Sequence, residues 1–217
     1  NRIFQTLVLG IVLLLLFMGY KTLTFNSKQI QVGTVDLIPV EDQVIDRFSQ
    51  ALTIKTISPE NESDFDSLAF FQFNDYLKTS FPLADSLLEK KSFNSFSHLY
   101  QWKGSDPSLN PIILMAHLDV VPVIEENLPD WKQPPFEGKI INDTLWGRGT
   151  IDDKIGVIGL LEATEALLSS GFQPKRTLYI SFGHDEEIGG LKGAKVIVEH
   201  LKAQGIEAQF VLDEGGT

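Results

Sequence analysis

The second half of this chain alternates short apolar segments with amphipathic ones, and this alternation restricts the fold more than any other feature. The short apolar segments predict strands and the segments with helical spacing predict helices, each closed by a glycine. The predicted strands are 111–116, 176–182 and 208–212, and the predicted helices are 153–170 and 191–204. Strands that alternate with helices are connected by βαβ crossovers. We therefore expect an α/β fold, with a mostly parallel mixed sheet covered by helices on both faces.

The first half adds two helices and a strand. Apolar residues at helical spacing predict helices over 41–57 and from Asp64 to about Ser80, with Phe71 or Phe73 facing inward. Apolar and polar residues alternate over 95–102, which predicts a half-buried strand with His98 as a structural histidine. We predict a long surface loop over 122–136 and a hairpin over 137–146 that turns at Asn142-Asp143.

The N-terminal segment is apolar from Ile3 to Tyr20. Its length reaches the lower limit for a membrane helix, roughly 17–25 residues, and it has no polar face that would suit a core helix. No small-residue cleavage pattern follows, so an uncleaved single-pass anchor is favoured over a signal peptide that is cleaved to give a secreted protein. The predicted division is an anchor or signal segment over 1–21, a linker over 22–40 and a catalytic domain over 41–217 on the exported side, whether periplasmic, extracellular or lumenal.

Composition restricts the partners. The 217 residues contain 18 Lys and Arg against 29 Asp and Glu, a net charge of −11. This net negative charge argues against electrostatic binding to nucleic acid. There are no cysteines, so any bound metal must be held by oxygen and imidazole ligands.

Acidic and imidazole side chains follow four predicted strands or turns. The four clusters are His117-Leu-Asp119, Asp152-Asp153, His184-Asp-Glu-Glu187 and Asp213-Glu214. Each alone has an ordinary explanation as a helix cap or a solvated turn. Together they bring a histidine and several carboxylates to the carboxyl edge of the sheet, where open α/β sheets bind ligands. The sequence therefore predicts a metal site at this edge.

The ligand types indicate the chemistry. Imidazole with carboxylate suits zinc, cobalt or manganese. Because a single catalytic zinc needs three protein ligands and a water, the larger number of candidates favours two ions, about 3.5–4 Å apart and bridged by a carboxylate. In the pair Glu186-Glu187 one carboxylate can bind metal while its neighbour acts on water. This division of roles predicts hydrolysis.

These motifs resemble the aminoacylase and carboxypeptidase S type of dinuclear zinc metallopeptidases. The resemblance covers about residues 41–217 and is carried by 115–122, 146–154, 183–190 and 212–216, together with Trp131 and 134–136. The wording Gly-His-Asp-Glu-Glu of residues 183–187 is most similar to the carboxypeptidase S branch.

The resemblance implies a role for each site residue. It implies that His117 and Asp213 hold one zinc, that Glu187 binds the other, and that Asp152 bridges the two. It also implies that the catalytic residues are Asp119, which orients His117, and Glu186, which is the general base. It also implies a cis peptide between Asp152 and Asp153. The implied activity is hydrolysis of an amide bond in a peptide or an N-acyl amino acid by a metal-bridging water. The implied cofactors are two Zn²⁺ ions, for which Co²⁺ or Mn²⁺ can substitute.

Two other functions are weighed against this one. A dinuclear-metal phosphoester hydrolase would need a phosphate cradle, and no such motif is evident. A catalytically silent binding domain would be favoured if the chain truly ended at Thr217. The resemblance instead implies a lid domain, a homodimer through that lid and a further zinc-ligand histidine beyond Thr217, so we expect an N-terminal portion that is inactive alone. His200, on a helix face, is not a substitute, and Arg148 and Lys154 are expected to form ion pairs with nearby acids rather than clamp a substrate carboxylate.

Overall fold

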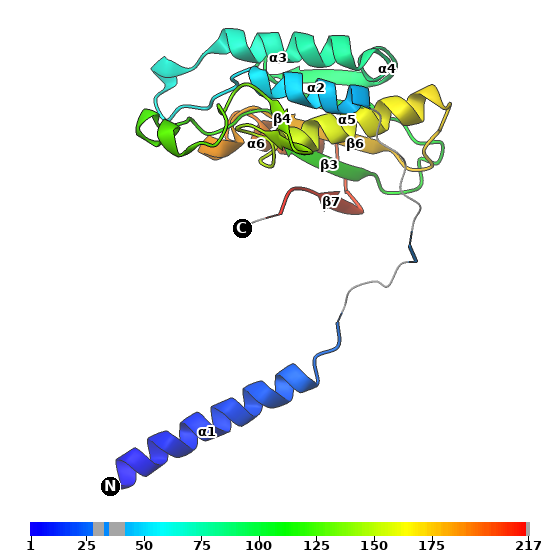
Figure 1. The fold of residues 1–217 in the computed structure, drawn as a ribbon. Helices are drawn as coiled ribbons and strands as arrows, with labels where there is room; N and C mark the ends of the chain where they lie inside the picture. Colours follow the sequence, from blue (N-terminus) through cyan, green and yellow to red (C-terminus); the bar gives the residue numbers. More distant parts are fainter. Residues whose placement is uncertain (28–32, 35–41, 216–217) are drawn as a thin grey trace. The chain divides into compact units, whose positions relative to one another are not determined.

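The computed structural model of the chain describes residues 1–27, 33–34 and 42–215 (Figure 1). It contains two compact units, Asn1–Pro39 and Val40–Thr217, which are described separately. Helix α1, Arg2–Leu23, extends through the start of the predicted linker. Most of the remaining linker lies outside the described residues.

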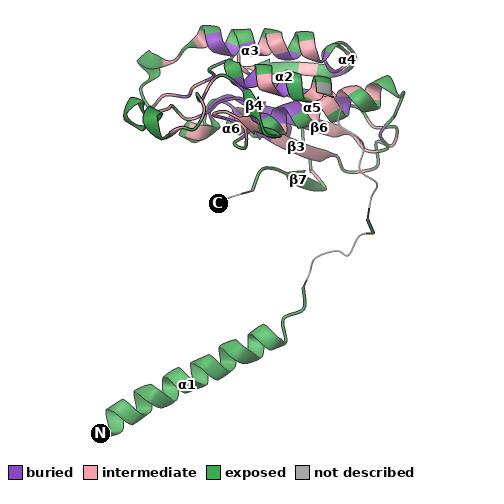
Figure 2. Ribbon diagram, in the orientation of Figure 1, coloured by how far each residue is buried: buried purple, intermediate pink, exposed green. Residues whose placement is uncertain are grey.

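Helix α1 is long and apolar, and none of its residues is buried (Figure 2). Its 22 residues give a length of about 33 Å at 1.5 Å per residue, close to the ~30 Å hydrocarbon core of a bilayer. It is a candidate membrane span by length and composition, and a signal sequence near the N-terminus would pass the same test. The anchor therefore stays a prediction.

A five-stranded sheet forms the centre of the second unit, in the order β1-β2-β6-β3-β7. The strands are β1 Glu89–Phe93, β2 Ser97–Trp102, β3 Ile112–His117, β6 Leu178–Gly183 and β7 Phe210–Leu212. Strand β3 pairs in parallel with β6 and β7, whereas β2 is antiparallel to β1 and β6. The α/β fold and mixed sheet are confirmed, but the described pairings are half antiparallel. The reason is the tight turn with positive φ at Asn94 and Ser95, which joins β1 to β2.

Helices cover both faces of this sheet, as predicted. Helices α2 Asp42–Thr53, α3 Ser67–Ser80, α4 Pro82–Leu87 and α5 Lys154–Ser169 lie on one face, and α6 Ala194–Ala203 lies on the other (Figure 1). Alternate residues of the strands face the two layers. Tyr100 and Ile180 pack into the larger core, whereas Leu99 and Tyr179 pack against α6.

Several predicted boundaries are wrong. The first helix ends at Thr53 rather than Ile57, because the following chain pairs with residues 118–120: Ile57 forms a parallel bridge with Val120, and Thr56 Oγ1 donates to the Leu118 carbonyl over 2.6 Å. Strand β2 is almost fully buried rather than half-buried, because it lies between β1 and β6 under both helix layers.

The α-helix α4 and the strand β1 were not predicted. Pro82 reads as a helix stop, but it occupies the first turn of α4, where proline is tolerated. The side chain of Glu165 on α5 accepts hydrogen bonds from the Leu83 and Ala84 amides over 2.9 Å each. A cap supplied from 80 residues away in the chain is not visible in local sequence.

The segment that joins β3 to α5 contains short elements. The predicted loop 122–136 includes the 3-10 helix η2, Glu125–Asp130, and the predicted hairpin consists of β4 Lys139–Ile141 and β5 Thr144–Trp146. Asn142 and Asp143 have φ values of 50° and 58°, as a two-residue hairpin turn requires. A further 3-10 helix, η1, spans Glu62–Asp64.

We expect Phe73→Ala to lower the free energy of unfolding by roughly 3–5 kcal/mol, the usual loss for a large core aromatic. Phe73 is 0% exposed, whereas Phe71 on the same helix is 47% exposed. Phe71→Ala is the matched control and should cost at most about 1.5 kcal/mol, from its ring contact with Phe96. Chemical denaturation measures both, and equal losses would contradict this packing.

Candidate metal centre

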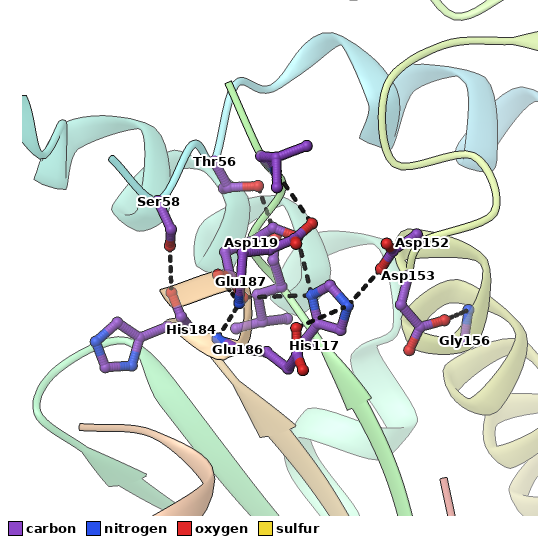
Figure 3. Close-up of polar contacts among 12 residues, drawn as sticks. Thr56, Ser58, His117, Asp119, Asp152, Asp153, Gly156, His184, Glu186 and Glu187 are labelled. Carbon is purple, nitrogen blue, oxygen red and sulfur yellow. Dashed lines mark hydrogen bonds and ion pairs between the residues drawn. The ribbon is translucent and has the colours of Figure 1, made fainter. Parts of the chain in front are cut away.

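Side chains from segments far apart in the sequence lie together at the carboxyl edge of the sheet (Figure 3). His117 is the last residue of β3, and Asp152 lies in the turn before α5. Glu186 and Glu187 begin the short 3-10 helix η3, Glu186–Ile188, just after β6. The parallel pairing of β3 with β6 places His117 directly opposite Gly183 and thereby brings these segments together.

His117 is the centre of the cluster. It is 2% exposed, and its Nε2 lies 2.8 Å from Asp152 Oδ1, 3.7 Å from Glu214 Oε2 and 3.9 Å from Glu186 Oε2. Its other ring nitrogen, Nδ1, lies 3.0 Å from the Asp119 carbonyl and 3.3 Å from Asp119 Oδ1. If Nδ1 carries the proton, Nε2 presents a lone pair toward the carboxylates.

The buried carboxylate of Asp119 orients the backbone of Glu186 and Glu187 as well as the His117 imidazole. It is 0% exposed, and its two oxygens accept hydrogen bonds from the amides of Glu186 and Glu187 over 3.1 Å each. Burial alone would raise the pKa of Asp119, but the hydrogen bond and charge of His117 and the hydrogen bond from the Glu187 amide outweigh it, so this pKa lies below its usual range. Asp119 therefore fixes the start of η3 relative to the end of β3.

Within the part of the chain that the structure describes, two groups of side chains have ligand atoms close enough together to hold a metal ion. One consists of His117, Asp152 and Glu187, and the other of His117, Glu186 and Glu214. Within each group the ligand atoms lie within 4.8 Å of one another. Imidazole with carboxylate is the donor set that suits zinc and similar divalent ions.

The charges of the first group act on one another. Burial lowers the pKa of His117, but the hydrogen bonds and charges of Asp119 and Asp152 outweigh it and raise this pKa to about 10. Burial and then the Asp152 charge raise the pKa of Glu187 to about 7. The raised pKa values mean that the imidazole and the carboxylates retain protons. A bound divalent cation would replace these protons.

The structure separates Asp213 from its neighbour Glu214. Both line a cavity of about 310 Å³ beside His117 and Glu186. However, Asp213 belongs to neither group of ligand atoms, and its Oδ1 accepts a hydrogen bond from the Glu214 amide over 3.0 Å. The metal-ligand role that the resemblance implies for Asp213 stays a prediction, and Glu214 is the neighbour whose carboxylate lies 3.7 Å from His117 Nε2. Adjacent residues of an extended segment point to opposite sides, and no pattern in the sequence shows which of the two faces β3.

Asp152 and Asp153 have different surroundings. The peptide between them is cis, as the resemblance implied. The Asp153 side chain accepts a hydrogen bond from the Gly156 amide and caps α5, whereas the Asp152 side chain is 59% exposed and contacts His117.

The expected ion pairs of Lys154 and Arg148 are wrong. Lys154 is 1% exposed, and its ammonium donates to the carbonyls of Ala51 and Ile54 over 3.0 and 2.5 Å, 4.5 Å from the Phe73 ring centroid. The Arg148 guanidinium lies over the Trp131 ring, and within the described part of the chain it has no carboxylate partner.

The remaining histidines lie outside the cluster. The ring nitrogens of buried His98 contact Ser92 and Asn74, and burial lowers its pKa to about 3, as suits a structural histidine. His184 Nδ1 lies 2.6 Å from Ser97 Oγ, on the far side of the turn from His117. His200 lies on α6, near Lys91.

Residues 113–217 match the family model described as "Peptidase family M20/M25/M40". The chain belongs to this family. A "Probable carboxypeptidase S-like 2" of Dictyostelium discoideum is 40% identical over 98% of this chain and 42% of its own length. An "N-fatty-acyl-amino acid synthase/hydrolase PM20D1" of Xenopus tropicalis is 43% identical over 80% of this chain and 33% of its own length.

Solved structures share the fold of this M20/M25/M40 chain. The M20 family metallo-carboxypeptidase Sso-CP2 of Sulfolobus solfataricus superposes with a TM-score of 0.64 at 21% identity, covering 81% of this chain and 38% of that one. Human carnosine dipeptidase 1 gives a TM-score of 0.60 at 19% identity, over 81% and 38%. The chain thus spans about two fifths or less of the length of the relatives described here.

The raised pKa of His117 predicts how the stability of the metal-free protein depends on pH. Between its unfolded value of about 6.5 and its folded value of about 10, the folded state holds the extra proton. The stabilisation is fully present below pH 6.5 and is lost as pH rises toward 10. Thermal unfolding of chelator-treated protein should show this loss, and His117→Gln should remove it.

His200→Gln is the control for this measurement, because His200 lies outside the cluster. The difference between the wild type and each variant isolates one histidine from other titrating groups. An unchanged difference between wild type and His117→Gln from pH 6 to pH 10 would contradict the proposed imidazolium.

Proposed function

We propose that the protein is a metal-dependent hydrolase that cleaves an amide bond in a peptide or an N-acyl amino acid. The observation that carries the proposal is the surroundings of the buried His117. Carboxylates of both ligand groups lie close to its imidazole, and a cavity at the edge of the sheet lies beside it. Family membership supports hydrolase activity, since the matched family is a peptidase family. Because this chain is a minor part of its relatives' length, the activity is proposed for the full-length protein.

The donor set fits divalent metal. We propose that His117, Asp152, Glu187 and one of the adjacent pair Asp213 and Glu214 would hold two zinc ions, for which Co²⁺ or Mn²⁺ would be substitutes. Burial and then the Asp152 charge raise the pKa of Glu187, so a divalent cation would stabilise the charged form of this carboxylate. When bound, zinc supplies Lewis acidity that polarises a carbonyl and lowers the pKa of water.

Glu186 is assigned as the general base. Its backbone amide in η3 donates to Asp119, and its Oε2 lies 3.9 Å from His117 Nε2. Its side chain is 49% exposed. A carboxylate placed this way can take a proton from the attacking water and deliver it to the leaving nitrogen. Asp119 is a positioning residue, because it holds His117 and both glutamate amides while remaining buried.

The substrate class follows from the relatives. One set is described as carboxypeptidase S-like and another as N-fatty-acyl-amino acid synthase/hydrolase. Both descriptions fit an amide bond next to an amino acid. Three features remain proposals: a homodimer through a lid domain, a single-pass membrane anchor, and a catalytic domain on the exported side. They rest on the resemblance and on the apolar α1.

We expect Glu186→Gln in the full-length protein to lower kcat by about 10²–10⁴-fold, since the amide cannot accept a proton. Metal content measured on the same sample should equal that of the wild type. Chelation of the wild type should abolish activity, and zinc should restore it. Unchanged amide hydrolysis in Glu186→Gln would remove the assignment of the base.

The pair Asp213 and Glu214 offers a matched test of the ligand assignment. Glu214→Gln should weaken metal binding by at least about tenfold, whereas Asp213→Asn, one residue away, should weaken it less. Metal titration against a chromogenic chelator measures both variants. The opposite order would return the ligand role to Asp213.

A further inference from the structure

A further cavity lies on the other side of the η3 turn from His117. It has a volume of about 510 Å³, and it is lined by residues between α2 and α3, in the turn between β1 and β2, and around η3. Within the η3 turn, Glu186 lines the cavity beside His117, whereas Asp185 and Ile188 line the further cavity. The ring of His184, which also lines the further cavity, points away from His117 (Figure 3). This cavity is therefore separate from the proposed metal centre.

Three aromatic rings lie together in the wall of the further cavity. The ring centroids of Phe65 and Phe96 are 5.4 Å apart, and the centroid of His184 lies 6.4 Å from that of Phe65 and 5.5 Å from that of Phe96. The ring planes are inclined to one another by 55° to 68°, so the faces of the rings point in different directions. Ile188 and Leu191 add exposed apolar side chains to the lining. Because the face of a phenyl ring carries negative partial charge, such a wall attracts a cation.

The charges around these rings also favour a cation. Three carboxylates line the cavity, those of Glu60, Glu62 and Asp185, and Lys192, which pairs with Glu62, is the one cationic side chain of the lining among the described residues. Asp185 is 4% exposed, and its Oδ2 accepts a hydrogen bond from the Lys192 amide over 2.7 Å. Its Oδ1 is buried and has no hydrogen-bond partner in the part of the chain that the structure describes. A buried carboxylate oxygen without a partner is costly, and a cation in the cavity would offset that cost.

We propose that the further cavity binds a small organic cation of the quaternary ammonium class. A quaternary ammonium ion donates no hydrogen bond, so aromatic faces and carboxylates that attract it at a distance are the groups that recognise it. The cavity volume falls in the ~300–1,000 Å³ range of small-ligand sites. A phosphate-bearing lipid head group would bring an anion among the three carboxylates, so the lining favours a free cation. The proposal does not depend on the proposed hydrolysis.

The test compares choline with 3,3-dimethylbutan-1-ol, the uncharged isostere in which carbon replaces the quaternary nitrogen. Calorimetric titration of the zinc-loaded, full-length protein should show choline binding at least about tenfold more tightly, because the ring faces and carboxylates attract only the charged probe. Both probes carry the same hydroxyl, and a quaternary nitrogen has no lone pair for zinc, so the comparison reports on charge recognition rather than on metal ligation. Phosphocholine should bind more weakly than choline, and equal or tighter binding of phosphocholine would overturn the assignment of a free cation.

Variants locate the binding in the further cavity. Phe96→Leu keeps an apolar side chain in the lining but removes a ring face, and it should weaken choline binding roughly 3–30-fold while the isostere binds as before. Phe172→Leu is the matched control, because the Phe172 ring contacts Trp102 and does not line this cavity, and it should change neither affinity. Equal affinities of choline and its isostere in the wild type, or equal choline affinities in the two variants, would overturn the proposal.

A surface charge provides a second test that does not depend on the packing of Phe96. Glu60 lines the cavity at an exposed position, so Glu60→Gln should weaken choline binding about two- to fivefold without a change in the fold. Glu207→Gln removes the same charge at an exposed position outside the lining and should leave choline binding unchanged. Equal choline affinities in these two variants would likewise contradict the proposal.

Discussion

The buried carboxylate of Asp119 is the interaction on which the arrangement of the site depends. Its oxygens accept the amides of Glu186 and Glu187, and one of them lies 3.3 Å from His117 Nδ1. A fully buried carboxylate without these partners would cost several kcal/mol. The same bonds that make its burial tolerable thus fix the imidazole and the two glutamates relative to one another. Two strand ends, of β3 and β6, are joined through a single side chain.

Backbone pairing outside the sheet supports this carboxylate. Thr56 Oγ1 donates to the Leu118 carbonyl, and the Val120 amide donates to the Thr56 carbonyl, so the residues on either side of Asp119 are held by the segment after α2. Ser58 donates to the His184 carbonyl and so connects the same segment to the turn after β6. This segment explains why α2 ends at Thr53. A longer helix would withdraw the chain that encloses Asp119.

The sequence predicted those features that depend on local pattern and on strand ends. The βαβ alternation placed His117, Asp152 and the Glu186-Glu187 pair at one edge, and the Asn142-Asp143 hairpin and the cap at Asp153 follow from local turn and capping chemistry. Features that depend on distant partners were not accessible. The Glu165 cap that begins α4 is one example. Another is which of Asp213 and Glu214 lies nearer to His117, because one residue reverses the direction of a side chain in extended backbone.

The segment from Leu145 to Lys154 shows how strictly such register matters. Arg148 lies on Trp131, Asp152 contacts His117, Asp153 caps α5, and Lys154 fills a dry site against the carbonyls of Ala51 and Ile54. The last of these contacts is the most demanding, because a buried ammonium without hydrogen-bond acceptors would cost several kcal/mol. Burial lowers the pKa of Lys154 to about 7, so the ammonium is retained only where carbonyls and the Phe73 ring receive it. A shift by one residue would place either the Asp153 carboxylate or the Ile155 side chain among these carbonyls, and would exchange Asp152 beside His117 for Ile151 or Asp153. Lys154 therefore helps to fix which of the two adjacent aspartates lies beside His117.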